Sequence, residues 1–470
     1  MRESPDQPVV IGAGPAGMAC AWTLAAAGVP VKILEKEDLP GGLCRTLNFN
    51  GHLFDIGGHR FLSKSAEVNR LWHEVMQEDM LHVKRLSRIY FHKKFFDYPL
   101  SFFNTFRNLG LWESLRCIAS YFRCLLTHPG DERTFEGWIT NHFGRRLYEI
   151  FFKTYTEKVW AVVCGGISAD WAAQRIRGLS LRVALREIFF KSGARPKTLA
   201  EEFLYPRTGP GEFYQRFERR IWGLGGEFAY HTRVSGLRHE KNKITALLVE
   251  ETPSGRIFEM PVPFVFSTMP LPLLVRAMIP QAPEPVLAAA RQLRFRSFLV
   301  VNVILNREHV FPDQWIYIQD PEVRMGRIQN YKNWSPAMTM DLRKTSLGLE
   351  YFCTQDDDLW RMNDVDLIDF ALMELEKTGL AGRRDYVNGF VVRRANVYPV
   401  YSLGYEKHVG VIRAWLETFD NLKTLGREGL FHYDNSDHAL LTGIYAARNY
   451  LGEGPYNVWD VNVDESYLET

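Results

Sequence analysis

The N-terminal residues alternate between apolar runs and a glycine-rich turn. Val9–Lys36 has the sequence VVIGAGPAGMACAWTLAAAGVPVKILEK. The apolar run Pro8–Ile11 is typical of a buried parallel strand, and the alanine-rich Met18–Ala27 predicts a helix. Val31–Leu34 predicts a second strand that ends at Glu35. This order of strand, turn, helix and strand predicts a βαβ unit of a Rossmann-like domain.

The turn itself has the spacing of a dinucleotide-binding motif. Gly12, Gly14 and Gly17 follow the pattern G-x-G-x-x-G. The first glycine permits the tight turn, the second lets a pyrophosphate approach the backbone, and the third lets helix and strand pack closely. The helix N-terminus offers free N–H groups to phosphate, and the acid after the second strand accepts hydrogen bonds from ribose hydroxyls. The expected contacts are Gly12, Gly14, Pro15, Ala16, Gly17, Glu35 and Lys36.

Two more glycine-rich segments distinguish a flavin from a nicotinamide. Pro40–Thr46 is PGGLCRT and Gly51–Leu62 is GHLFDIGGHRFL. A bound flavin needs backbone to approach it over a long path, and glycines permit that approach. We therefore expect Gly41, Gly42 and Leu43 near the pyrophosphate and ribityl chain, Gly57 and Gly58 near the ring, and His59 against the flavin.

A second strand, polar turn and helix follow near the end of the chain. Asn421–Gly426 predicts a strand and Leu440–Leu451 predicts a helix. Arg427, between them, is a charge-assisted partner for a pyrophosphate. The N–H groups around Asp437, His438 and Ala439 suit the flavin's pyrimidine edge or ribityl chain, and Val234, at the end of the strand expected over Phe228–Val234, completes the set. These segments together predict non-covalently bound FAD.

The remaining patterns divide the chain into five segments. An α/β fold is expected, in which a Rossmann-like FAD domain of the glutathione-reductase type carries an inserted α+β substrate domain of helices and an antiparallel sheet. The FAD domain comprises residues 1–85, 201–295 and 386–470, while 86–200 is the mostly helical part and 296–385 the sheet part of the substrate domain. The strands expected downstream are a hairpin of Ile244–Glu250 and Arg256–Pro261, then Phe264–Met269, Phe298–Ile304 and Gly348–Cys353.

Composition restricts the partners and the compartment. A chain of 470 residues can form two or three domains. The net charge of +2, with both signs interspersed, does not indicate nucleic acid as the main ligand. No run of 18 apolar residues occurs, and the start MRESPDQP does not resemble a signal peptide. The six cysteines have neither C-x-x-C nor zinc-like spacing, which favours free thiols, a cytoplasmic location and no metal site.

Aromatic residues concentrate in Tyr90–Phe106, YFHKKFFDYPLSFFNTF. Three interpretations stay open for this segment: a core-packing segment of the second domain, a substrate-facing wall, or a patch that rests on a membrane surface. The helix expected at Leu115–Leu126 fits any of them. The sequence does not indicate an oligomeric state.

Several motifs resemble the UDP-galactopyranose mutases, which are FAD enzymes that interconvert the pyranose and furanose forms of UDP-galactose. The similar segments cover nearly the whole chain: Ile89–Phe106, YTEKVW at Tyr155–Trp160, Arg175 in AAQRIRG, RIQNYKNWSP at Arg327–Pro336, VYPVY at Val397–Tyr401 and GREGLFHYDNSDH at Gly426–His438. Trp334 stands where eukaryotic members usually have tyrosine, and two residues are missing between Tyr433 and Asp437. The N-terminal half also resembles protoporphyrinogen oxidases and other amine-oxidase-type flavoproteins.

The resemblance implies a nucleotide-sugar substrate and a role for each matching residue. Arg175 and Arg327 would clamp the diphosphate, since paired guanidinium groups suit two phosphates in a partly dry cleft. Further expected contacts are the Tyr398 and Tyr433 hydroxyls on the phosphates, Asn435 on sugar or flavin, Trp160 stacked on the base, and Trp334 in the nucleotide pocket. His59, Arg175, Arg327, Tyr398, Tyr433 and Asn435 form the expected catalytic group.

The reaction that this resemblance implies is covalent catalysis by the cofactor. Reduced flavin attacks the anomeric carbon through N5 and displaces the nucleoside diphosphate, and the sugar opens, recloses and is recaptured. There is no net redox change, and NAD(P)H would serve as the external reductant. The alternative is a net FAD-dependent oxidoreductase of the protoporphyrinogen oxidase or amine oxidase type, acting on an amine, a porphyrin-like ring or a polyprenoid chain.

Overall fold

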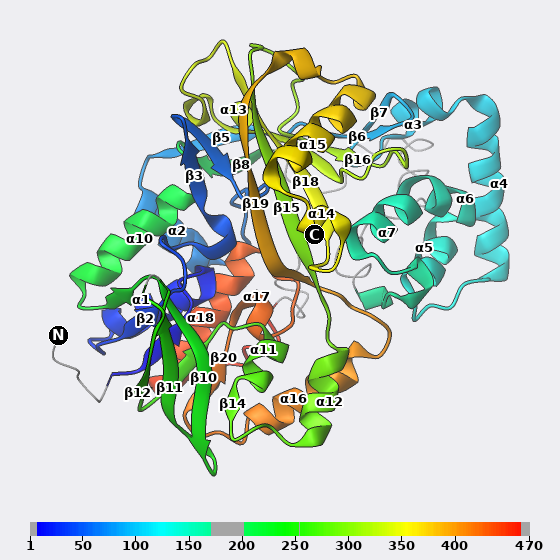
Figure 1. Cartoon of the computed structure of the whole chain (residues 1–470). Helices are drawn as coiled ribbons and strands as arrows, with labels where there is room; N and C mark the ends of the chain where they lie inside the picture. The colour runs from blue at the N-terminus through cyan, green and yellow to red at the C-terminus, as the bar shows by residue number, and fades with distance from the viewer. Residues whose placement is uncertain (1–6, 171–201, 253, 462–470) are drawn as a thin grey trace.

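A five-stranded parallel sheet forms the centre of the N-terminal fold unit. The computed structural model describes residues 7–170, 202–252 and 254–461. The strand order is β20 (Leu422–Thr424), β13 (Val265–Ser267), β1 (Val9–Ile11), β2 (Lys32–Leu34) and β9 (Glu227–Ala229), and all neighbours are parallel. Segments from both ends of the chain therefore meet in one sheet (Figure 1). The strands expected at Pro8–Ile11, Val31–Leu34, Phe264–Met269 and Asn421–Gly426 are confirmed, each slightly shorter than expected.

Helices α1 (Pro15–Ala26), α10 (Gly211–Gly223) and α18 (Ser436–Tyr450) pack with this sheet in one hydrophobic core. Helices α1 and α18 are in close contact: a Cβ atom at Gly443 would lie 2.1 Å from the carbonyl oxygen of Ala16. Helix α18 begins at Ser436, four residues before the expected Leu440. Its first turn consequently carries Asp437, His438 and Ala439.

A four-stranded sheet lies beside this unit, with the order β12 (Arg256–Pro261), β11 (Lys243–Glu251), β10 (Thr232–Glu240) and β14 (Met278–Ile279). The hairpin expected from residues 244–261 is confirmed. The prediction of a single strand at 228–234 is wrong. The chain turns at His231, which has φ of +52°, and divides this stretch between β9 and β10. These two strands belong to different sheets. Helices α11 (Leu271–Arg276), α12 (Glu284–Gln292) and α16 (Tyr405–Leu416) contribute to the core here.

The third unit is a seven-stranded sheet. Its order is β19 (Tyr386–Pro399), β15 (Phe295–Leu305), β18 (Thr345–Cys353), β17 (Arg327–Asn330), β16 (Trp315–Ile318), β6 (Ser87–Phe91) and β7 (Lys94–Asp97). The strands expected at 298–304 and 348–353 are its second and third strands, which pair antiparallel. Strand β19 lies in the segment that was expected to return to the FAD domain, yet it pairs along its length with β15. Strands β6 and β7 likewise lie in the segment expected to be mostly helical.

Small elements connect these units. They are two antiparallel two-stranded sheets, β3 (Thr46–Phe49) with β4 (His52–Asp55) and β5 (Met80–Lys84) with β8 (Glu202–Pro206), and five helices. These are α2 (Ala66–Met76), α13 (Tyr331–Trp334), α14 (Asp358–Arg361), α15 (Asp364–Thr378) and α17 (Gly426–Gly429). Helix α15 packs its apolar side on the seven-stranded sheet.

A helical lobe projects from the seven-stranded sheet, drawn in cyan and teal in Figure 1. It contains α3 (Phe102–Leu109), α4 (Leu111–Thr127), α5 (Phe135–Phe143), α6 (Arg145–Leu147), a π-helical turn at Tyr148–Lys153 and α7 (Thr154–Trp160). Helix α4 lies at the outer edge of the lobe (Figure 1). No helix among the described residues is both long and apolar enough to cross a membrane.

Candidate cofactor and substrate cavity

One cavity of about 1590 Å³ lies where the parallel sheet, the seven-stranded sheet and the helical lobe meet. Pockets for one drug-sized ligand usually measure about 300–1,000 Å³, so this cavity has room for a cofactor and a second molecule. Most of the predicted site residues line it: Gly12, Gly14, Pro15, Ala16, Glu35, Lys36, Gly42, Leu43, Gly58, His59, Trp160, Val234, Arg327, Trp334, Tyr398, Arg427, Tyr433, Asn435, His438 and Ala439.

The glycine turn after β1 has the geometry that its spacing predicts. Gly12 has φ of +98°, and a Cβ atom there would lie 2.2 Å from the hydroxyl oxygen of Thr268. Gly17 is packed behind the turn, where a Cβ atom would lie 1.9 Å from the carbonyl oxygen of Gly12. Gly14 precedes α1 and supplies no side-chain cap. Gly14, Pro15 and Ala16 line the cavity, so the first turn of α1 lies at its wall without a side-chain cap, which suits a phosphate.

The second glycine segment faces the first across a narrow gap. Gly42 has φ of +56°, and a Cβ atom on it would lie 3.2 Å from the Cα atom of Gly14. Any side chain at either position would fill the gap. Because neither Gly14 nor Gly42 has a side chain, only backbone lines the narrow space beside the N-terminus of α1.

Glu35 lies at the end of β2 and is only 7% exposed. Its carboxylate accepts hydrogen bonds from the N–H of Ala13 (2.7 Å) and of Glu37 (3.0 Å), which fixes its orientation beside the turn. Two arginines that the sequence reasoning missed meet at Glu37: Arg45, with a nitrogen at 3.3 Å, and Arg394 of β19, at 3.2 Å. The Nε atom of Arg394 is buried with no hydrogen-bond partner among the described residues, and Arg394 lines the cavity.

Arg427 is the clearest feature that fits a cofactor pyrophosphate. Its guanidinium carbon lies 4.7 Å from the ring centroid of Tyr398 and 4.4 Å from that of Tyr433. Its Nη1 donates to the carbonyl of Asp434 at 3.3 Å, while Nε and Nη2 are buried with no partner among the described residues. The preceding Gly426 lies against the first turn of α1, where a Cβ atom would lie 2.8 Å from the Cβ atom of Ala16. Buried cations need acceptors, so the residues present fit a bound dinucleotide.

The N-terminus of α18 borders the same cavity. Asn435 precedes the helix, and its backbone N–H donates to Nδ1 of His438 at 3.3 Å. Asn435, His438 and Ala439 line the cavity, whereas Asp437 is buried and does not. The N-termini of α1 and α18 thus border the same cavity.

His59 is held as a neutral imidazole. Its Nε2 lies 3.0 Å from the carbonyl oxygen of Ile56, and since a carbonyl only accepts, Nε2 carries the hydrogen. Its Nδ1 lies 3.8 Å from the thiol of Cys44. Burial, together with the cations of Arg427 and Arg327, lowers the pKa of His59 to about 4. His59 therefore presents no positive charge to the cavity near neutral pH.

Gly58 has a further packing role that the sequence did not indicate. A Cβ atom there would lie 2.9 Å from Nε2 of Gln329 and 3.1 Å from the Trp334 ring. Trp334 itself is buried, stacks on Trp315 at 5.2 Å and donates to the carbonyl of Gln314 at 3.1 Å. Trp334 thus borders the cavity mainly as part of a core cluster.

Arg327 lies on β17 and forms an ion pair with Glu350 of β18, whose side chain is fully buried. Glu350 also accepts from Nε2 of Gln329 at 2.9 Å. The Nη2 of Arg327 reaches the hydroxyl of Tyr398 at 3.3 Å. Burial opposes the charge of Arg327, but Glu350 and the surrounding tyrosines outweigh it, and the pKa of Arg327 is raised. The sequence predicted Arg327 as a free phosphate clamp and did not predict its carboxylate partner.

Three aromatic side chains surround these cations. Tyr398 and Tyr433 stack at 5.7 Å, and Trp160 lies edge-on to them at 6.3 and 5.8 Å. Burial raises the pKa of Tyr398 to about 12, so its hydroxyl stays protonated and can donate. These three residues come from separate segments of the chain: Tyr398 from β19, Trp160 from α7 and Tyr433 from the loop before α18. They form one aromatic cluster beside Arg327 and Arg427.

Arg175, the predicted partner of Arg327, lies outside the described residues. The functional residues that the sequence reasoning missed are Glu350, Gln329, Arg45, Arg394 and the helical-lobe aromatics Phe143, Phe151 and Phe152. These three aromatics line the cavity. Phe103 and Phe106, from the segment for which a substrate-facing wall was one interpretation, line it as well. A buried acid inside the apolar strand LGLEYFC was the one available signal for Glu350. Among the described residues no group of three His, Cys, Asp or Glu side chains could hold a metal ion.

A family profile described as "Flavin containing amine oxidoreductase" matches residues 15–448. The chain belongs to this flavin-containing amine oxidoreductase family. Membership supports FAD as the cofactor. It agrees with the glycine turn, the gap at Gly42 and the two Arg427 nitrogens that have no partner among the described residues.

Individual relatives match only part of this sequence. A phytoene desaturase of Fusarium fujikuroi is 43% identical over 70 residues, 15% of this chain and 11% of that protein. A probable UDP-galactopyranose mutase of Klebsiella pneumoniae is 29% identical over 164 residues, 33% of this chain and 41% of that protein. The matches thus span less than half the length of these curated relatives.

Similarity in structure extends over the whole chain. The crystal structure of reduced UDP-galactopyranose mutase covers 99% of each chain with a TM-score of 0.84 and 22% sequence identity. The resemblance to the mutases that the motifs indicated is confirmed for the fold. At this identity the likeness does not transfer the activity.

Proposed function

We propose that this family member is a flavoenzyme acting on a nucleotide-diphosphate sugar, with pyranose–furanose interconversion as its reaction. The observation that carries the proposal is the convergence of Arg327 and Arg427 on one tyrosine, Tyr398, inside the cavity that the glycine turn enters. Reduced FAD would supply the nucleophile for the anomeric carbon, and no net redox change would result. The printed name of the Klebsiella relative and the shared fold favour the same reaction class.

The chain's own residues would bind, orient and shield the substrate. Arg427, against the first turn of α1, would hold the cofactor pyrophosphate. Arg327 would face the substrate diphosphate, and the Tyr398 and Tyr433 hydroxyls would donate to its oxygens. Glu350 fixes the Arg327 side chain and offsets its charge, so the site binds phosphate through directed hydrogen bonds more than through net positive charge. Arg175 remains a proposed second arginine of this clamp.

Neutral His59 and Trp160 have positioning roles in this proposal. His59 would lie against the flavin without adding a charge, since its pKa is lowered to about 4. Trp160 would stack on the base, with Asn435 bonded to sugar or flavin. NAD(P)H is proposed as the reductant that keeps the flavin reduced.

We also propose a glutathione-reductase-type arrangement for the FAD unit, assembled from residues 1–85, 201–295 and 386–470 apart from strand β19. The substrate unit would comprise residues 86–200 and 296–385. A cytoplasmic location is proposed as well, since all six cysteines are buried and unpaired.

A second candidate is a net oxidoreductase for an apolar substrate. It is favoured by the arm of the cavity in the helical lobe, whose lining includes Phe103, Phe106, Phe143 and Phe151. For such a substrate Arg327 would have no anionic partner other than Glu350.

Turnover with the flavin in each redox state distinguishes the two. The protein is reduced with dithionite and incubated with UDP-galactofuranose, and the pyranose product is measured by chromatography. Conversion only in the reduced state, strongly decreased in Arg327→Lys and Tyr398→Phe, is the expected result. Arg324→Lys is the matched control, because Arg324 pairs with Asp358 on the surface and does not line the cavity. Steady oxygen or quinone consumption with an apolar substrate, equal in all variants, would establish the oxidoreductase instead.

A further inference from the structure

Helix α4 exposes its more apolar side. Leu111, Leu115, Phe122 and Leu126 are 64%, 47%, 52% and 83% exposed. Their spacing of four, seven and four residues places them on one stripe of the helix. The opposite side, buried in the lobe, carries Ser114, Cys117, Tyr121 and Cys124. Both sides of α4 are therefore largely apolar, whereas a helix on the surface of a protein surrounded only by water has a polar outer side.

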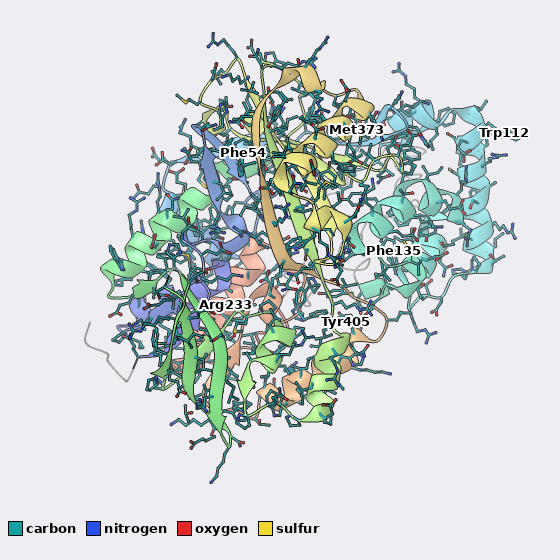
Figure 2. All side chains as sticks on the ribbon, viewed as in Figure 1. Phe54, Trp112, Phe135, Arg233, Met373 and Tyr405 are labelled. Atoms are coloured by element: carbon teal, nitrogen blue, oxygen red, sulfur yellow. The ribbon has the colours of Figure 1, made fainter. Side chains whose placement is uncertain are left out.

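The stripe is part of a larger apolar surface. Trp112 is 69% exposed and Phe103, on the adjoining helix α3, is 77% exposed. We call Phe103, Leu111, Trp112, Leu115, Phe122 and Leu126 the α3–α4 face. Trp112 lies at the outer edge of the helical lobe (Figure 2). Single exposed apolar residues are normal, but a contiguous set of this size marks an interaction surface.

The chain segment that carries the α3–α4 face is rich in basic residues. Between His92 and His128 the chain has five lysines and arginines, Lys93, Lys94, Arg107, Arg116 and Arg123, but only two acids, Asp97 and Glu113. Glu113 is already paired with Arg146 and lies 3.7 Å from Arg116. Arg107 and Arg123 are exposed and form no ion pair with a described residue. The segment that carries the face therefore has a net positive charge.

The cavity reaches the same face. Phe103 belongs to the cavity lining although it is 77% exposed. Leu109, Cys117 and Ile118 line the cavity from beneath the α3–α4 hairpin. The apolar arm of the cavity thus extends to the surface at the edge of the exposed apolar stripe.

We propose that the α3–α4 face docks this protein on an anionic lipid surface, with α4 lying in the plane of the headgroups. Leucine, phenylalanine and tryptophan on one side of a helix with arginines beside them are the pattern of an interfacial helix. Anionic headgroups complement the excess of lysine and arginine. A second copy of the chain would instead bring the same basic surroundings against themselves, because a two-fold interface joins identical patches. The proposal goes beyond the reaction and does not depend on it.

The test is co-sedimentation of the purified flavoprotein with two kinds of vesicle, phosphatidylcholine alone and phosphatidylcholine mixed with phosphatidylglycerol. The wild type should bind the mixed vesicles, and the double variant Leu115→Glu, Phe122→Glu should lower its partition coefficient about a hundredfold, roughly tenfold for each side chain. Both positions are exposed, so the flavin absorbance should persist. The matched control is Ile257→Glu, Val365→Glu, at sites 63% and 76% exposed on other elements, and it should bind as the wild type does.

The charge component has its own variant. Arg116→Gln, Arg123→Gln should weaken binding to the mixed vesicles roughly 25-fold, because each basic residue near an anionic surface contributes about fivefold. Equal binding to both vesicle types, no binding to either, or undiminished binding of the Leu115, Phe122 variant would each overturn the proposal. So would a wild-type dimer that the same variant converts to monomer while neither binds vesicles.

Discussion

The buried pair of Arg327 and Glu350 makes a quantitative prediction through the variant Glu350→Gln. The substitution keeps the size of the side chain and an acceptor for Gln329, but it removes the charge that balances Arg327. Glu350 is completely buried, whereas 20% of the Arg327 side chain is accessible, toward the cavity. The variant therefore isolates the effect of leaving one buried cation without its anion.

Removing one partner of a buried ion pair costs about 3–5 kcal/mol. Because water in the cavity can reach part of Arg327, we expect the lower end, about 3 kcal/mol. The entropy of unfolding is about 2.1 cal/mol/K per residue, or roughly 1 kcal/mol/K for this chain. The midpoint of thermal unfolding should therefore decrease by about 3 °C.

Thermal unfolding, followed by circular dichroism, measures this shift against a matched control. Asp358→Asn breaks the pair with Arg324, which has hydrogen bonds of 2.6 and 2.7 Å but side chains 45% and 67% exposed. Exposed pairs contribute about 0–1 kcal/mol, so that midpoint should change by less than about 1 °C. A nucleoside diphosphate should then raise the midpoint of Glu350→Gln more than that of the wild type, because it supplies the missing negative charge. If Glu350→Gln and Asp358→Asn have equal midpoints, the argument from burial is refuted.

Two further predictions concern the cofactor groove and pH. Gly42→Ala should lose most of its flavin absorbance after gel filtration, because the residue has φ of +56° and a Cβ atom would lie 3.2 Å from Gly14, whereas Gly223→Ala, with nothing within 4 Å, should retain it. Burial raises the pKa of Asp55 to about 7, and hydrogen bonds from Tyr205 and Thr46 only partly offset this. Native Asp55 thus keeps a proton that the unfolded chain releases above about pH 4, so urea stability should decrease as the pH rises from about 4 to about 7, and Asp55→Asn should lack this slope. An unchanged slope in that variant would contradict the assignment.

The sequence by itself determined the dinucleotide turn and the first βαβ unit. These depend on interactions within about 25 residues: Gly12, Gly14 and Gly17 set a turn, and Glu35 ends the next strand. Local conformational preferences decide such a unit, so its spacing is sufficient to predict it. Arg427 was predicted for a related reason, since it follows a strand and precedes a helix that both approach the cofactor.

Only the tertiary structure decided which strands join which sheet and which charges meet. Strand β19 is compatible with either unit in sequence, and its pairing with β15, some 90 residues earlier, assigns it to the seven-stranded sheet. Glu350 and Arg327 lie on adjacent strands, and a carboxylate in an apolar run does not reveal which cation it will face. The exposed side of α4 is likewise a property of packing, since an amphipathic pattern states that two sides differ but not which one the protein buries.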